Sequence, residues 1–79
     1  MVRIPTDVRP ADLIKLMESR GFTRDRQSGS HIIMKHPGPP ERSIAVPVHR
    51  TIKVGTLRGI LQAVSEQTGV PLADLAKLL

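Results

Sequence analysis

The 79-residue sequence predicts one small α+β domain, residues 1–79, with a three-stranded antiparallel sheet and helices packed on one face. Apolar residues recur at helical spacing near the start of the chain and again in its last third. Between them lie three short strand-like segments joined by hairpin-length connections, which make neighbouring strands antiparallel. A chain of this length has room for one modest core.

The first helix is predicted over residues 10–20. Pro10 suits the first turn of a helix, and Gly21 suits the left-handed position just past its end. Four apolar residues then share one side of the helix: Leu13, Ile14, Leu16 and Met17.

Two strands are predicted next, over residues 22–26 and 30–36. Both contain bulky or β-branched residues, and they flank the turn signal Gln27-Ser28-Gly29. Alternation along the second strand puts apolar residues on both of its faces. The pattern therefore leaves open which face packs on the helices.

A second turn is predicted over residues 37–41, where three of five residues are prolines without an amide donor. A third strand follows over residues 43–48. Pro47 indicates a sheet edge or a strand end. Three apolar residues alternate onto one face of this strand: Ile44, Val46 and Val48.

Two helices are predicted after a basic loop over residues 49–54. The longer one begins near Gly55 and ends at Gly69, and Pro71 opens a short last helix. Apolar residues at helical spacing mark both helices: Leu57, Ile60, Leu61 and Val64 in the first, and Leu72, Leu75, Ala76 and Leu79 in the second. This order of elements is that of a double-stranded RNA-binding domain, which is an argument about fold and not about function.

The charge balance favours a polyanionic partner. The chain carries 12 Lys and Arg against 7 Asp and Glu, a formal charge of +5. Phe22 is its one aromatic residue, so a platform that stacks several bases is not expected. A bound nucleic acid would be held through phosphates, 2′-hydroxyls and shape.

Several classes of site are excluded by composition. Without cysteine there is no disulfide, thiolate zinc site or cysteine nucleophile, and a reducing cytoplasm is the simplest location. No signal-like or membrane-length apolar run and no phosphate-binding loop occurs, so neither a membrane nor a small-molecule cofactor is expected. A zinc site is rejected because His31 and His36 would lie roughly 17 Å apart on one strand.

His31 is the leading candidate for chemistry. It follows Gly29-Ser30 at the mouth of the second predicted strand, where a tight turn leaves an imidazole near the surface and able to exchange protons near neutral pH. A lone histidine in a strand is more often a plain surface residue, and that interpretation stays open. His36 and His49 are interpreted as turn or rim residues.

Several polar residues are candidates for RNA contact. Lys53 and Thr56 stand where a helix start attracts anions, although Thr56 is equally compatible with simple capping. The cations of the hairpin are equally compatible with a solvated face. The full set of candidates is Arg24, Arg26, Ser30, Lys35, Lys53, Thr56 and Arg58.

Six motifs follow one another over roughly residues 9–64. They are Leu13-Ile14-Lys15-Leu16, Gly21-Phe22, Arg26-Gln27-Ser28-Gly29-Ser30-His31, His36-Pro37, Val46-Pro47 and Gly55-Thr56-Leu57-Arg58-Gly59-Ile60-Leu61. No single motif is specific, but their joint order and spacing are, and in these the chain resembles the HicA toxin family. Departures from the family pattern are the last helix, present only in some members, and Met34, where an aromatic residue is commoner.

The resemblance implies an mRNA interferase of a HicA-HicB toxin-antitoxin pair, inhibited by a HicB-like antitoxin protein, with His31 of the Gly-Ser-His motif as the catalytic histidine. We expect metal-independent cleavage by the neighbouring 2′-hydroxyl, with His31 moving a proton and nearby cations offsetting charge. Two alternatives remain: a noncatalytic RNA-binding module, and a regulatory subunit that acts through a protein partner.

Overall fold

The computed structural model describes residues 2–79; Met1, the first residue of the predicted domain, lies outside them. The α+β prediction is confirmed, with an antiparallel sheet of order β1-β2-β3 and helices on one of its faces. The elements are α1 (Pro10–Ser19), β1 (Thr23–Ser28), β2 (His31–His36), β3 (Arg42–Pro47), α2 (Val54–Thr68) and α3 (Leu72–Lys77).

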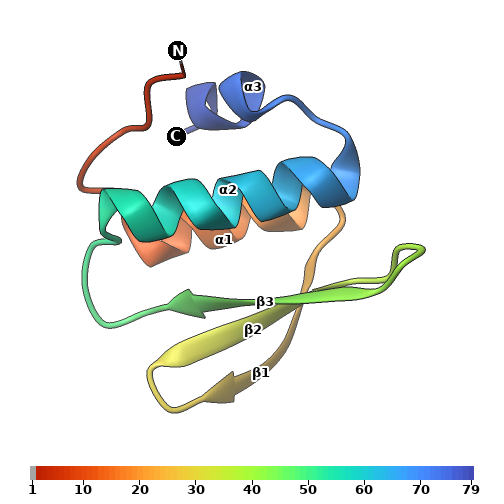
Figure 1. Cartoon of the computed structure of the whole chain (residues 1–79). Coiled ribbons are helices and arrows are strands. Elements are labelled where there is room, and N and C mark those ends of the chain that lie inside the picture. Colours follow the sequence, from red (N-terminus) through yellow and green to blue (C-terminus); the bar gives the residue numbers. More distant parts are fainter. Residues whose placement is uncertain (1) are drawn as a thin grey trace.

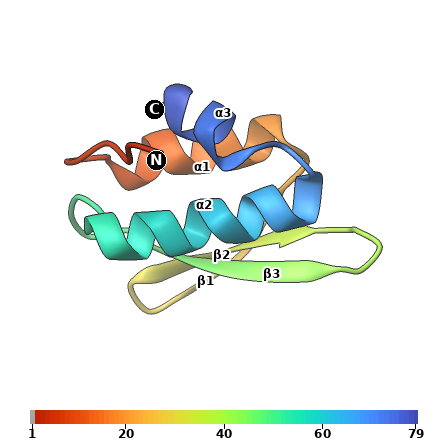
Figure 2. The same cartoon turned by 45° about the horizontal axis from the view of Figure 1, so that its top comes forward.

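The elements form layers (Figure 1). Helices α1 and α2 lie side by side over one face of the sheet, and α3 lies on the side of these helices that faces away from the strands. The view in Figure 2 shows the same arrangement and leaves the opposite face of the sheet uncovered by residues 2–79. Among these residues no helix is long and apolar enough to span a membrane.

The core lies between the sheet and the pair of helices α1 and α2. Helix α3 covers this pair on the side away from the sheet (Figure 1). All four apolar residues predicted on α1 are buried, and so are all four predicted on α2. Helix α2 ends as predicted, because Gly69 adopts a left-handed φ of 78° and donates its N–H to the Ser65 carbonyl over 2.8 Å. Leu75 brings α3 into the same cluster and is fully buried.

The structure decides which face of the sheet is packed. Met34 is fully buried and pairs with Ile44, whereas Ile33 pairs with exposed Ala45 on the uncovered face. His31 is two residues from Ile33 and three from Met34 along β2. It therefore lies on the uncovered face with Ile33, opposite to Met34. Packing against the helices thus determines which face of β2 is buried, which the strand pattern left open.

The first hairpin differs from the predicted one. Strand β1 runs on through Ser28, and the turn is the two residues Gly29 and Ser30, so the prediction of a turn over residues 27–29 was wrong. Gly29 has a φ of 58° and Ser30 does not, the signs required by a type II′ turn. This turn matches the twist of the strands and pairs Ser28 with His31.

Candidate active site

His31 lies where three segments of the chain meet. It is the first residue of β2, is exposed, and pairs with Pro47, the last residue of β3. The same end of the molecule holds the β1–β2 turn, the end of β3 and the connection from β3 to α2 (Figure 1). The imidazole is therefore placed among loops and not in the middle of a strand surface.

The connection from β3 to α2 is held at both ends. At one end, the Val48 N–H donates to the Ser30 carbonyl over 2.9 Å, which extends the ladder one residue past Pro47. At the other end, Ile52 is buried and donates its N–H to the Val8 carbonyl over 2.9 Å. Residues 49–51 lie between these two anchors, so their backbone positions are constrained by the sheet and by the segment before α1.

This connection and the sheet enclose a pocket of about 320 Å³. Its apolar wall is formed by Ala45, Pro47 and Ile52. No carboxylate of the described chain lines it. Its polar side chains are those of His31, His49, Arg50, Thr51, Lys53 and Thr56. Two cations without an acid beside them make this hollow attractive to an anion.

The start of α2 adds backbone dipoles to this pocket. Lys53 is the N-cap in extended conformation, and its carbonyl accepts the Leu57 N–H over 2.8 Å. No side chain caps this helix end, so the interpretation of Thr56 as a simple cap was wrong. The first amides of a helix have no partner within it, and they carry partial positive charge.

The cations of the hairpin are not gathered at His31. An irregularity at Asp25 between the pairs of Arg24 and Arg26 turns these two arginines to opposite faces of the sheet. On the helix side, Arg24 Nε lies 3.7 Å from Glu18 Oε2. On the uncovered face, Arg26 pairs with the Asp25 carboxylate.

Three further candidates stand apart from the pocket lining. Lys35 lies on the uncovered face, with its Nζ 3.8 Å from Glu41 Oε1. Ser30 contributes its carbonyl to the Val48 hydrogen bond and has an exposed side chain. Arg58 is exposed on α2 but does not line the pocket. Of the predicted set, the pocket thus brings together His31, Lys53 and Thr56.

Three polar pocket residues, His49, Arg50 and Thr51, were missed as site residues from the sequence. His49 was interpreted as a rim residue because no motif surrounds it. Strand alternation does not point to it, because the chain bends at residues 49 and 50 after β3, and only the tertiary structure places His49 in the pocket.

His36, the third histidine, was interpreted as a turn or rim residue; it is the last residue of β2 and has a structural role at the other end of the sheet. Its Nδ1 accepts the Gly38 N–H over 3.0 Å and lies 3.0 Å from Gln67 Nε2. Its ring packs on Phe22 with centroids 5.0 Å apart. In residues 2–79 no three His, Cys, Asp or Glu side chains are grouped so as to hold a metal ion.

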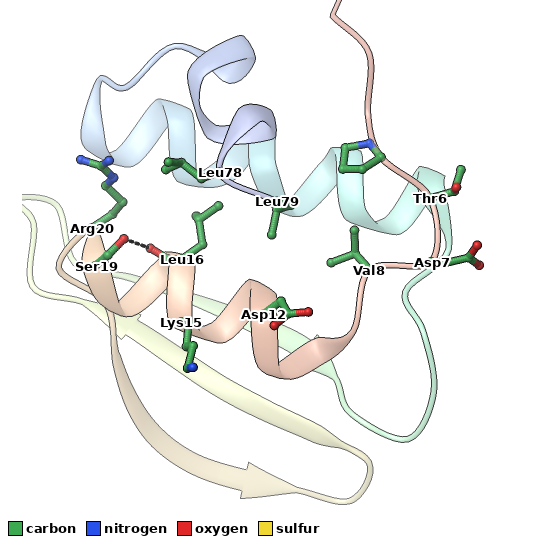
Figure 3. A pocket seen from close by; sticks show the side chains of 11 residues that line it. Thr6, Asp7, Val8, Asp12, Lys15, Leu16, Ser19, Arg20, Leu78 and Leu79 are labelled. Carbon is green, nitrogen blue, oxygen red and sulfur yellow. Dashed lines mark hydrogen bonds between the residues drawn. The ribbon is translucent and has the colours of Figure 1, made fainter.

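A larger hollow of about 700 Å³ lies between α1, the segment before it and the C-terminal residues (Figure 3). Its charges are mixed, with Asp7 and Asp12 beside Lys15 and Arg20. The Ser19 hydroxyl at its edge donates to the Leu16 carbonyl within the helix. Carboxylates in the lining oppose a polyanion, which distinguishes this hollow from the pocket at His31.

The sequence model of one protein family, described as the HicA toxin of bacterial toxin-antitoxin, matches residues 10–70. The chain belongs to the HicA toxin family. As a HicA toxin it acts within a toxin-antitoxin system and has an antitoxin partner. Comparisons with curated proteins and with solved structures found no match.

In this HicA toxin, the matched region runs from the first residue of α1 to just past α2. It contains every residue that lines the pocket at His31. Helix α3 lies beyond it and contributes to the core, not to the pocket.

Proposed function

We propose that this HicA toxin is a metal-independent endoribonuclease that cleaves mRNA, with His31 as a proton-transfer residue. The observation that carries the proposal is that His31 opens onto a pocket that, within residues 2–79, is lined by two cations and no carboxylate. A phosphodiester fits the electrostatics of such a hollow, and an imidazole is the side chain best suited to move protons at neutral pH. A double-stranded RNA-binding-like fold is compatible with this role but does not itself argue for it.

In the proposed reaction, the 2′-hydroxyl attacks the adjacent phosphorus and the 5′-oxygen of the next nucleotide leaves. The products are a 2′,3′-cyclic phosphate and a free 5′-hydroxyl. His31 accepts or donates one of the two protons that move, a contribution of about 10²–10⁴-fold for one positioned group. Arg50 and Lys53 offset the charge that develops on the phosphoryl oxygens.

The surface beside the pocket supports a path for a flexible strand. A second hollow shares His49, Arg50 and Thr51 with the first and extends to Arg9 before α1. Phe22 is 1% exposed and therefore offers no ring for base stacking. The RNA is accordingly held mainly through its backbone, which predicts binding that weakens as salt rises.

We further propose that the antitoxin partner is of the HicB type, that it inhibits by covering the pocket at His31, and that the toxin acts in the cytoplasm. A cover over this hollow would remove both the histidine and the cations from RNA. This arrangement needs no change in the fold of the toxin.

The test has two parts. Wild-type and His31→Ala protein are induced in cells, where growth and RNA integrity are followed. The purified proteins are then incubated with RNA with and without EDTA. We expect cleavage by the wild type, unchanged by EDTA, and cleavage about 10²–10⁴-fold slower by the variant. Equal degradation by both proteins, or loss of cleavage on chelation, overturns the proposal.

The same assays separate the two alternatives. Wild-type protein that binds RNA and never cuts it identifies a noncatalytic RNA-binding module. Wild-type protein with neither growth arrest nor salt-dependent RNA binding identifies a subunit that acts through a protein partner.

A further inference from the structure

His49 lines the same pocket as His31. Pro47 is paired with His31, and the Val48 hydrogen bond to Ser30 carries the ladder one step further. The next residue, His49, lies at a bend that follows this ladder, and it lines the same pocket of about 320 Å³ as His31. A phosphodiester bound in this pocket is therefore within reach of both imidazoles.

His49 lies at the surface of two hollows and is not packed in the core. It is exposed and lines both the pocket at His31 and the adjoining hollow. The charged side chains that line these two hollows are the cations Arg9, Arg50 and Lys53. Of these, Arg9 is paired with Asp12, with its Nε 3.5 Å from Asp12 Oδ2. In these hollows no carboxylate of the described chain faces His49, and its backbone is held by the Val48 anchor.

We propose that His49 is a second catalytic residue and that His31 and His49 form an acid-base pair. This inference rests on the proposed ribonuclease function. His31 accounts for only one of the two proton transfers, and His49 would perform the other. One imidazole, neutral at the start, takes the proton from the 2′-hydroxyl as the O2′–P bond forms. The other, protonated at the start, gives its proton to the 5′-oxygen as the P–O5′ bond breaks.

The first experiment maps where purified wild-type toxin cuts a labelled transcript and then uses a short oligonucleotide that spans the site, with one ribose at the cut position. Cleavage rates are measured against pH for wild type, His31→Gln and His49→Gln. His36→Gln, which changes the third histidine at the far end of the sheet, is the matched control. Circular dichroism confirms that each variant is folded.

We expect His49→Gln to lower the cleavage rate by about 10²–10⁴-fold, as for loss of one positioned acid or base. The wild-type pH profile is bell-shaped, and each variant of the pair loses one limb of it. Binding to an oligonucleotide with deoxyribose at the cut position stays at the wild-type value in His49→Gln. A defect confined to binding, with the bell-shaped profile intact, overturns the proposal.

The second experiment replaces the 5′-oxygen at the cut position by sulfur. A thiolate leaves without needing a proton, so this substrate no longer requires the general acid. If the histidines divide the two proton transfers, one of the two variants recovers a rate near that of wild type and the other does not. Recovery by both variants or by neither overturns the pair and assigns a different role to His49.

Failure of this inference is distinguishable from failure of the proposed function. Cleavage lost in His31→Gln but within a few-fold of wild type in His49→Gln keeps the ribonuclease and removes the pair. Wild-type protein that does not cut RNA removes the proposed function itself.

Discussion

The backbone N–H of Val48 donates to the carbonyl of Ser30 over 2.9 Å. Each of these residues directly precedes a histidine, His49 in one case and His31 in the other. One hydrogen bond therefore ties together the two segments that carry the proposed catalytic groups. This hydrogen bond helps to fix the position of one imidazole relative to the other.

Gly29→Ala is expected to destabilise the protein and slow cleavage. Gly29 has a φ of 58°, a conformation that costs an L-residue roughly 1–2 kcal/mol. Relaxation of the turn would displace His31, and a shift of about 1 Å at a catalytic group costs up to about 10²-fold in rate. Chemical denaturation measures the free energy of unfolding, and a cleavage assay measures the rate.

Gly59→Ala is the matched control for that substitution. Gly59 lies inside α2, and an added Cβ meets no atom within 4 Å. Alanine there should raise the free energy of unfolding by about 0.5–1 kcal/mol, because glycine loses more conformational freedom on folding. Equal effects of the two substitutions would contradict the account of the Gly29 turn.

Lys53→Ala is expected to weaken RNA binding and to reduce its salt dependence. Lys53 lines the pocket and begins α2, so its ammonium is placed to contact a phosphate. Loss of one phosphate contact lowers the slope of log affinity against log salt by about 0.7 for a single strand. Fluorescence anisotropy with an uncleavable oligonucleotide over a salt series gives this slope.

Lys77→Ala, on α3, removes the same charge from the far side of the helices. Its salt slope should stay at the wild-type value. A slope lowered equally by both substitutions would show that net charge, and not the pocket, sets the binding.

Gln67→Ala is expected to loosen the turn between β2 and β3 without affecting cleavage. The Gln67 amide donates to the Pro40 carbonyl over 2.7 Å and lies 3.0 Å from His36 Nδ1. Each such hydrogen bond contributes about 0.5–1.5 kcal/mol. Thermal unfolding should show a lower midpoint, whereas a large loss of cleavage would mean that this end of the sheet takes part in RNA recognition.

Leu75→Ala is expected to cost about 2–5 kcal/mol, because Leu75 is fully buried and its truncation leaves a cavity. This is comparable with the whole stability of a small domain. Leu78→Ala, at a residue 53% exposed, should change stability by less than about 0.5 kcal/mol. Unfolding midpoints near wild type for both would show that α3 is not part of the core.

Much of the fold follows from local patterns. The helical spacing in residues 10–20 and 55–69 requires one apolar side, and burial of that side is what the structure shows. Glycine and proline mark the ends because they restrict backbone conformation locally. The turn after β1 was misplaced because Gln27 and Ser28 are compatible with both strand and turn, and strand pairing decides between them.

By itself, the sequence determined the order of helices and strands, the family resemblance and the position of His31 beside a tight turn. Tertiary structure decided which sheet face is uncovered, how Arg24 and Arg26 are separated, and that His49 joins His31 at one pocket. The reason is physical, because the spacing of apolar residues indicates only which neighbouring residues of one helix or strand share a face. A pocket built from two strands, a loop and a helix start depends on register and packing between distant segments.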